Sequence, residues 1–242
     1  MHYPSVQKAR FLSRSNRFVA YVEWKGTTLL CHVKNTGRCK ELLLPGAAVY
    51  LCESRNPARK TRFDLIAVEK NGVLFNIDSQ APNQVAWEWL WDGGLGFFPS
   101  LVRPEQKFGA SRLDFYYEAP ERKGFLEVKG VTLEQDEMLY FPDAPTERGV
   151  KHLEELMKCK AAGYEAGVLF VIQTTKAKAF APNWETHPAF GYALQRAYKA
   201  GVRVLARCCE VAPDRMTLCQ KAVPVLLEGP GNREKRSEIL CQ

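Results

Sequence analysis

Three charged residues lie at strand-like spacing in the segment 109–130, GASRLDFYYEAPERKGFLEVKG. Asp114 stands between large apolar residues, and Glu127 and Lys129 alternate with apolar residues further along. Burying a charge among apolar side chains is costly unless the charge is paired or binds a metal. Two interpretations are open: the three residues lie on the solvated face of an ordinary hairpin, or they face a cleft in which the acids hold a metal ion.

The two acids meet in only one register of the predicted hairpin. A loop of even length, such as residues 119–122, sets Asp114 opposite Glu127. The same register sets Arg112 opposite Lys129. A loop of odd length places the acids on opposite faces of the sheet unless a bulge restores the parity. The meeting of the two acids is therefore a testable statement about register.

Facing carboxylates repel one another, so one tends to take up a proton unless a cation lies between them. Such a cation is expected to be Mg²⁺ or Mn²⁺, because Mg²⁺ uses one or two carboxylates together with water and phosphate oxygens. Glu105 could add an acid from the segment that enters the sheet. Lys129 would lie beside the attacking water, where it could deprotonate or orient that water or stabilise a pentavalent phosphate. Such a site could hydrolyse a phosphodiester.

The elements that precede this segment are short and β-like. Five apolar runs of strand length fill residues 17–78 and are separated by turn signals. Asn71-Gly72, between the last two runs, indicates a two-residue hairpin. Several short strands in such a short segment favour a closed barrel, since closure removes exposed edges. We predict an N-terminal domain over residues 1–81 that is an OB-like five-stranded barrel, with an SH3-like barrel as the alternative.

Beyond this domain the pattern alternates between helices and strands. Asn83 is a good N-cap, and the helix that follows it ends at Gly93-Gly94. A second helix begins at the N-cap Thr146 and ends at Gly163, and a third covers residues 187–200. The apolar stripe of the second helix is predicted at the following positions: Val150, Leu153, Met157 and Ala161.

The run GVLFVIQ, which follows the second helix, is apolar on both faces, as a parallel strand covered by helices would be. A further strand pattern follows the third helix. Strand-helix-strand crossovers next to a hairpin indicate an α/β domain with a mixed sheet over residues 82–228. The polar segment 229–242 is predicted to be a loose tail.

The composition restricts the classes of function that the sequence supports. The 242 residues carry a net charge of +7 with a pI near 9.0, which suits phosphate-rich partners. The eight cysteines include no C-x-x-C pair, and the N-terminal segment has no signal-peptide pattern, so reduced thiols in a cytoplasmic protein are expected. No apolar run is long enough to span a membrane. Nothing in the sequence points to an obligate protein partner.

Several polar residues are candidates for binding a nucleic-acid backbone. Arg148 falls in the first turn of the second helix, where the helix N–H groups favour an anion. The alternative is a surface salt bridge. Asn35, Thr36 and Arg38 belong to a loop between two barrel strands, which either makes an ordinary turn or contacts phosphate next to the site. His152 is expected on the helix surface.

Four segments together resemble the SfsA family, the sugar fermentation stimulation protein A homologues: EQKFGASRLDF, FLEVKGVTL, YFPDAPTERGVKHLEEL and KNTGRCKELLLPG. The resemblance spans most of the chain. It implies an N-terminal OB-like domain and a C-terminal domain of the PD-(D/E)xK nuclease superfamily. It also implies DNA binding without sequence preference and metal-dependent cleavage of DNA or RNA. The alternative is a non-catalytic DNA-binding protein with a regulatory role in maltose metabolism.

By this resemblance, Asp114 takes the place of the first motif acid, Glu127 that of the second, and Lys129 that of the motif lysine. Glu105 matches a glutamate upstream of the first acid. Lys34 stands where the family often has proline, which leaves the loop motif recognisable but less rigid. The resemblance thus implies a metal site formed by Asp114, Glu127 and Glu105.

Overall fold

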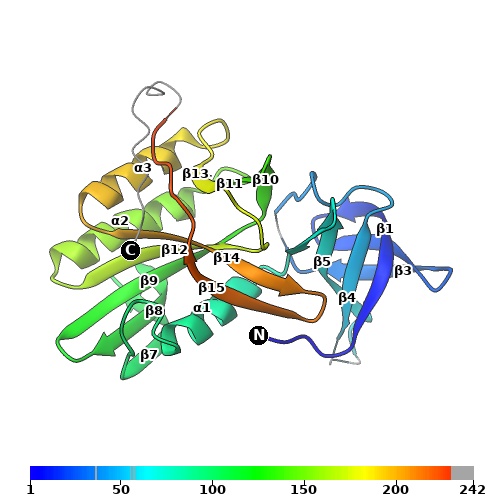
Figure 1. Ribbon diagram of the computed structural model, residues 1–242, viewed down its shortest axis with the longest axis horizontal. Helices are drawn as coiled ribbons and strands as arrows, with labels where there is room; N and C mark the ends of the chain where they lie inside the picture. Colours follow the sequence, from blue (N-terminus) through cyan, green and yellow to red (C-terminus); the bar gives the residue numbers. More distant parts are fainter. Residues whose placement is uncertain (36, 55, 57, 230–242) are drawn as a thin grey trace.

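The computed structural model describes residues 1–35, 37–54, 56 and 58–229 of the chain. Figure 1 shows two lobes side by side, a β-barrel built from the N-terminal part of the chain and an α/β lobe built from the rest. Of the predicted tail, residues 230–242 lie outside the described residues. Within the described part of the chain, no helix has the length and apolar character needed to cross a membrane.

Six strands form the sheet of the first lobe, in the order β3-β2-β1-β4-β5-β6. A parallel pairing of β3 with β5, at His32 and Val33, closes the first five strands into a barrel. Alternate side chains point inward, and Phe11, Val22 and Leu65 lie in its core. The strands are β1 (Val6–Asn16), β2 (Val19–Trp24), β3 (Thr27–Val33), β4 (Ala48–Glu53), β5 (Phe63–Lys70) and β6 (Val73–Asn76).

The predicted OB-like barrel of five strands is confirmed, but one of its strands differs. β1 was not among the predicted strands, because most of its residues are polar and only Ala9 and Phe11 are buried. β6, which was counted as a barrel strand, instead extends β5 as a hairpin. Its turn residues Asn71 and Gly72 have φ values of 51° and 73°, as a type I′ turn requires.

A second six-stranded sheet forms the α/β lobe, in the order β15-β14-β12-β9-β8-β7. Strands β9, β12 and β14 run parallel and the outer strands antiparallel, so the sheet is mixed, as predicted. Its strands are β7 (Leu101–Phe108), β8 (Ser111–Ala119), β9 (Arg122–Val131), β12 (Glu165–Ile172), β14 (Arg203–Ala212) and β15 (Arg215–Ala222). A small separate sheet contains β10 (Leu133–Gln135), β11 (Met138–Phe141) and β13 (Ala179–Pro182).

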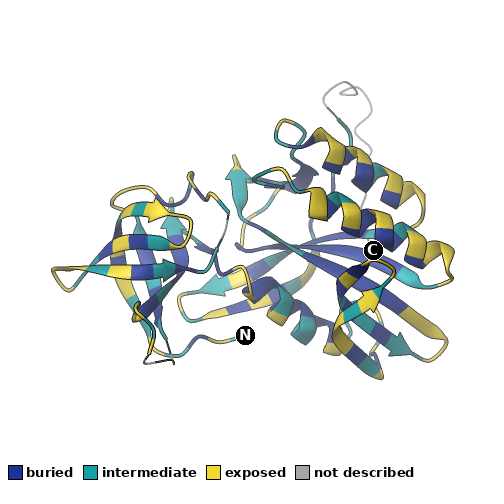
Figure 2. Ribbon diagram, turned by 180° about the vertical axis from the view of Figure 1, so that it is seen from behind, coloured by how far each residue is buried: buried dark blue, intermediate teal, exposed yellow. Residues whose placement is uncertain are grey.

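Helices cover both faces of the mixed sheet (Figure 1). α2 and α3 pack on one face around Leu153, Phe170 and Leu194, and α1 packs on the other around Val85 and Leu169. Figure 2 shows the central strands buried and the outer sides of α2 and α3 exposed. The helices are α1 (Ala81–Trp91), α2 (Glu147–Ala161) and α3 (Pro188–Lys199).

The helix ends differ from the prediction at one place. α1 begins earlier than expected: its N-cap is Gln80, and Asn83 lies in its first turn rather than at the cap. α2 begins after Thr146 as predicted, and the Thr146 hydroxyl accepts the N–H of Gly149 at 3.0 Å. The side chain of Asn83 is therefore free of any capping role and available for another contact.

The buried face of α2 also differs from the predicted apolar stripe. Of the four predicted positions only Leu153 is buried, and Ala161 is exposed. His152 and Glu155, both polar, are buried on this face. A pattern that counts apolar residues alone cannot find a face on which two ionisable side chains are buried.

A buried polar network joins the two lobes. Gln173, just past β12, donates from Nε2 to Oδ1 of Asn76 at 3.0 Å and to the carbonyl of Asp78 at 3.1 Å. The Asp78 carboxylate accepts hydrogen bonds from Lys34 Nζ at 2.8 Å and from the Tyr3 hydroxyl at 3.2 Å. Because buried polar groups are costly when unpaired, this network holds the barrel in a defined position against the α/β lobe.

Candidate functional site

The hairpin of β8 and β9 has the register that brings the two predicted acids together. Tyr116 pairs with Phe125, as the loop of even length requires. The ladder ends one pair beyond this, and the next facing positions are Asp114 and Glu127. Burial and the charge of Glu127 both raise the pKa of Asp114, as is expected of neighbouring carboxylates.

Beyond the acids the two strands separate. Arg112 pairs with β7 and Lys129 with β12, so these two residues do not face each other as the extended register predicted. The Asp114 carboxylate lies at the point of separation, where its Oδ2 accepts the backbone N–H of Val128 at 2.8 Å. A side chain thus takes over one strand-to-strand hydrogen bond, and the sheet opens beside the two acids.

Glu127 lies at the centre of a buried cluster of charged side chains. The residue is only 2% exposed. Its Oε1 accepts hydrogen bonds from Nζ of Lys129 and from Nδ1 of His152. Lys129 reaches it from the same face of β9, and His152 reaches it from the buried face of α2. Two donors on one oxygen fix the orientation of the carboxylate.

His152 links Glu127 to Arg148 at the start of α2. The Arg148 Nε–H donates to Nε2 of His152 at 3.3 Å, so Nε2 is an acceptor and the ring proton lies on Nδ1, facing Glu127. Arg148 is exposed, and among the described residues it has no salt-bridge partner, so the salt-bridge alternative finds no support. Its remaining donors face solvent in the helix turn where anions are favoured.

The environments of the two acids push their pKa values apart. Burial and then the charge of Glu127 raise the pKa of Asp114 to about 6, although a hydrogen bond from Asn83 Nδ2 at 2.9 Å works against this. Burial would raise the pKa of Glu127 too, but the hydrogen bond from His152 and the charge of Lys129 outweigh it and hold that pKa below its usual value.

The donor set fits a divalent cation. The second carboxylate oxygen of Glu127, Oε2, is buried and has no hydrogen-bond partner among the described residues. A buried unpaired carboxylate oxygen is costly, and an ion shared with the neighbouring Asp114 would satisfy it. Glu155 also has a buried unpartnered oxygen, but this oxygen is packed against Gly109, where an added Cβ would lie 2.3 Å from it.

Glu105 is not brought into this pair. Its φ is 53°, at a position that the β7–β8 pairing skips without a shift of register, and its exposed carboxylate lies 3.5 Å from the guanidinium of Arg112. Within the described part of the chain, no group of three or more acidic, histidine or cysteine side chains is placed to hold a metal. The predicted third acid is thus exposed and lies beside Arg112, and among the described residues two of the predicted acids are neighbours.

The predicted phosphate-binding loop between β3 and β4 contacts the second lobe. The backbone N–H of Arg38 donates to Oδ2 of Asp143, which lies between β11 and α2, at 2.9 Å. Asn35 donates from Nδ2 to the carbonyl of Ile77 at 2.9 Å. Thr36, the third predicted residue of this loop, lies outside the described residues. The loop therefore lies at the seam between the lobes.

Arg14 of β1 organises this loop. Its guanidinium donates at 2.6 to 2.9 Å to the backbone carbonyls of four residues, which are Arg17, Asn35, Gly37 and Arg38. The carbonyls occupy its donors, so Arg14 shapes the loop. The side chains that remain beside it line a pocket of about 340 Å³, here called the basic pocket.

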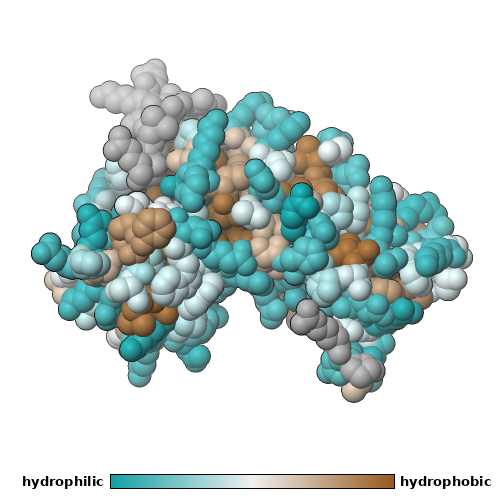
Figure 3. Space-filling model, turned by 60° about the horizontal axis from the view of Figure 1, so that its bottom comes forward, coloured by the Kyte–Doolittle hydropathy of each residue, from teal (hydrophilic) through white to brown (hydrophobic). Residues whose placement is uncertain are grey.

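The basic pocket is suited to anions. Arg17, Arg38 and Lys40 line it, and in the described part of the chain no carboxylate lies within salt-bridge distance of any of the three. Uncompensated cations in a concave surface attract phosphate. Figure 3 shows hydrophilic side chains over much of the barrel, which lies at the right of that view.

Two residues of the cluster were assigned other places by sequence reasoning. Asn83 was predicted as a helix cap and instead donates to Asp114. His152 was predicted on the helix surface and instead contacts Glu127. The i, i+4 spacing of Arg148 and His152 places both on one helix face, and this was the available signal.

The fold and the cluster define a class of protein, an OB barrel joined to an α/β lobe with a buried acid-acid-lysine set. The chain matches the family model "SfsA N-terminal OB domain" over residues 12–77 and the model "Sugar fermentation stimulation protein RE domain" over residues 80–215. The chain therefore belongs to the SfsA family.

Similar proteins agree with this assignment. A "Sugar fermentation stimulation protein homolog" of Desulfitobacterium hafniense (strain Y51) is 52% identical over 231 residues, which cover 95% of this chain and 100% of that protein. One of Clostridium beijerinckii is 50% identical, covering 90% and 96%. The solved structure "The structure of Pyrococcus Furiosus SfsA in complex with Ca2+" has a TM-score of 0.80 and 28% identity, covering 93% and 97%.

Proposed function

We propose that this protein is a divalent-metal-dependent nuclease that hydrolyses phosphodiester bonds in DNA or RNA without reading the sequence. The observation that carries the proposal is the pair of neighbouring acids, of which Glu127 has a buried oxygen without a hydrogen-bond partner. The basic pocket of the OB lobe also supports the proposal, because it offers a positively charged surface to the phosphate backbone of the substrate.

Asp114 and Glu127 would hold the cation. The binding of Ca²⁺ by the similar Pyrococcus furiosus protein supports a divalent ion in this family. When bound, Mg²⁺ or Mn²⁺ would supply positive charge at the scissile phosphate and lower the pKa of a coordinated water. His152 and Lys129 orient Glu127 through its other oxygen, so the carboxylate need not rearrange when the ion enters.

Lys129 and Arg148 would act on the phosphate. The ammonium of Lys129 has three donors, and Glu127 takes one of them. The remaining donors are free to orient the attacking water or to stabilise the negative charge that develops on phosphorus oxygens. Arg148 projects from the start of α2 and would hold the adjacent phosphate.

The barrel would guide the strand to this site. Arg38 and Asn35 belong to the loop at the seam, and Arg17 and Lys40 extend the positive surface along the barrel. Contacts of this kind are made to the backbone, so they bind any sequence and weaken as salt rises.

The testing experiment is a cleavage assay on labelled single- and double-stranded DNA and RNA in Mg²⁺, Mn²⁺ or EDTA, with Asp114→Asn and Lys129→Ala alongside. The proposal expects cleavage by the wild type in metal, its loss in EDTA and in both variants, and binding that is retained. Tight binding by the wild type without cleavage in any metal would contradict the nuclease and leave a non-catalytic DNA-binding protein.

A further inference from the structure

A second, smaller pocket of about 160 Å³ lies at the seam between the lobes. We call it the seam pocket. Gly37 lines both this pocket and the basic pocket. The seam pocket is also lined by Gly130, which directly follows Lys129 on β9. The seam pocket therefore lies between the loop that lines the basic pocket and the strand that carries Lys129.

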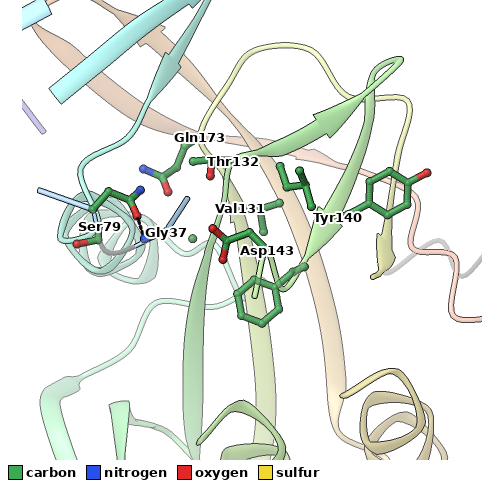
Figure 4. A pocket seen from close by; sticks show the side chains of 11 residues that line it. Gly37, Ser79, Val131, Thr132, Tyr140, Asp143 and Gln173 are labelled. Carbon is green, nitrogen blue, oxygen red and sulfur yellow. Dashed lines mark hydrogen bonds between the residues drawn. The ribbon is translucent and has the colours of Figure 1, made fainter. Parts of the chain in front are cut away.

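The charge of the seam pocket is opposite to that of the basic pocket. Of the eleven described residues that line it, Asp143 is the only charged one. A carboxylate repels a phosphate, so the seam pocket does not suit the phosphate backbone of a nucleic acid. Figure 4 shows the Asp143 carboxylate pointing toward Gly37, with the side chains of Thr132 and Gln173 beside it.

The pocket combines apolar walls with hydrogen-bonding groups, as a site for a nucleobase does. Val131 and Phe141 supply apolar surface, and the hydroxyl of Ser79 lies at the exposed rim. Asp143 uses Oδ2 to accept the N–H of Arg38, while Oδ1 accepts no hydrogen bond from a described residue. A cavity of about 150 Å³ holds one benzene ring, so the volume suits one aromatic ring.

Two glycines allow the walls of the pocket to approach this closely. A Cβ at Gly37 would lie 2.5 Å from Oδ2 of Asp143. A Cβ at Gly130 would lie 2.6 Å from Oε1 of Gln173. Side chains at these positions would displace the polar groups that line the pocket, so its shape depends on both glycines.

We propose that the seam pocket receives one unpaired nucleobase of the bound strand, and that Asp143 accepts a hydrogen bond from the exocyclic amino group of that base. This inference rests on the proposed function, because it concerns the strand that the site would cleave. A carboxylate accepts but does not donate. Cytosine, adenine and guanine offer it an exocyclic amino group with two N–H donors, whereas uracil and thymine have carbonyl oxygens there and only the ring N3–H to donate, so the pocket favours the first three bases. The preferred substrate is then a strand with unpaired bases.

The test compares two pyrimidines of one size. Fluorescence anisotropy in EDTA, where no cleavage occurs, measures the affinity for labelled oligo(dC), oligo(dU) and an abasic strand, each of about 12 nucleotides. The expected result is binding of oligo(dC) about tenfold tighter than of oligo(dU), with the abasic strand weakest. In Asp143→Asn the amide oxygen still accepts from Arg38 and the amide nitrogen faces the base, so the preference for cytosine is lost or reversed.

Two further variants complete the test. Asp136→Asn removes a charge at the exposed β10–β11 turn, outside the seam pocket, and should keep the preference for cytosine. Ser79→Tyr fills the pocket from its exposed rim and should bring oligo(dC) to the affinity of the abasic strand. Equal affinity of the wild type for the three strands would overturn the inference and leave the nuclease proposal standing. Uniformly tighter binding by Asp143→Asn would show simple charge repulsion and would also overturn it. Failure to bind any strand would overturn both.

Discussion

The carboxylates of Asp78 and Glu127 are buried to nearly the same degree and have different surroundings. Asp78 at the lobe seam is 1% exposed and Glu127 on β9 is 2% exposed. Asp78 accepts hydrogen bonds through both oxygens, from Lys34, Tyr3 and the backbone N–H of Gln80. Glu127 accepts through Oε1 alone, and its Oε2 has no partner in the described part of the chain.

This difference in hydrogen bonding distinguishes a carboxylate that stabilises the contact between the lobes from one at the candidate cation site. A buried carboxylate whose oxygens are all satisfied is complete without a ligand, and Asp78 stabilises the seam in this way. Glu127 has an unpartnered oxygen that a cation could satisfy, and under the proposed function Asp114 beside it would supply a second ligand for that cation. Burial alone therefore does not identify a candidate functional acid. Glu127 differs from Asp78 by its unpartnered oxygen, and from Glu155 by having a second acid, Asp114, beside it.

The largest expected effect is on cleavage. Glu127→Gln keeps an acceptor for Lys129 and His152 but removes the charge that holds the cation, so the cleavage rate should fall about 10³-fold. Single-turnover cleavage of a labelled strand measures this. Glu155→Gln, at another buried glutamate, is the matched control and should cleave as the wild type does. If the cleavage rate falls equally in Glu127→Gln and Glu155→Gln, Glu127 has no role that another buried glutamate lacks.

At the seam between the lobes, a substitution is expected to lower stability and to leave cation binding unchanged. Asp78→Ala leaves Lys34 and Tyr3 without their buried partner, so the free energy of unfolding should fall by about 3 kcal/mol. Urea unfolding followed by circular dichroism measures it. The affinity of the folded variant for Mn²⁺ should be unchanged. A variant that unfolds like the wild type but no longer binds the ion would reverse the assigned roles.

Asp114 offers a test by pH. Burial and Glu127 raise its pKa from 3.8 to about 6 in the folded protein. Between these values the folded state holds the proton that the unfolded state has lost, so the free energy of unfolding falls as pH rises. Without metal, Asp114→Asn should therefore be about 2 to 3 kcal/mol more stable than the wild type above pH 6, with this difference vanishing below pH 4. Urea unfolding of both proteins from pH 4 to above pH 6 measures this difference in stability. A difference that does not change with pH would refute the raised pKa of Asp114.

The smallest expected effect comes from His152. His152→Ala removes a donor from Glu127 without removing a proposed ligand, so affinity for Mn²⁺ should fall about tenfold. His152→Asn places an amide N–H near the position of Nδ1 and should recover part of the loss. Calorimetric titration of both variants gives the comparison. If both variants bind Mn²⁺ as the wild type does, His152 only fills space beside Glu127.

Local chemistry in the sequence was enough to predict the central pair. An even loop around Pro120 and Glu121 fixed the register, and alternation along β9 placed Glu127 and Lys129 on one face. The two-residue hairpin at Asn71-Gly72 and the N-cap Thr146 were predictable for the same reason, because each depends on a few neighbouring residues.

The remaining site residues depend on tertiary packing, which a single sequence does not display. His152 reads as a surface residue until α2 is laid on the sheet, and the contact of Asn83 with Asp114 needs α1 on the opposite face. Glu105 was predicted as a third acid, and its positive φ and its exposed position beside Arg112 cannot be seen in the sequence. β1 reads as polar because the barrel buries only two of its side chains.

The most direct test of the central claim is calorimetric titration of the protein with Mn²⁺ in the absence of nucleic acid. The account predicts saturable binding by the wild type, its loss in Glu127→Gln and in Asp114→Asn, and its retention in Glu155→Gln. Binding that survives both of the first two substitutions would contradict the claim that the unpaired oxygen of Glu127 and its neighbour Asp114 form the cation site.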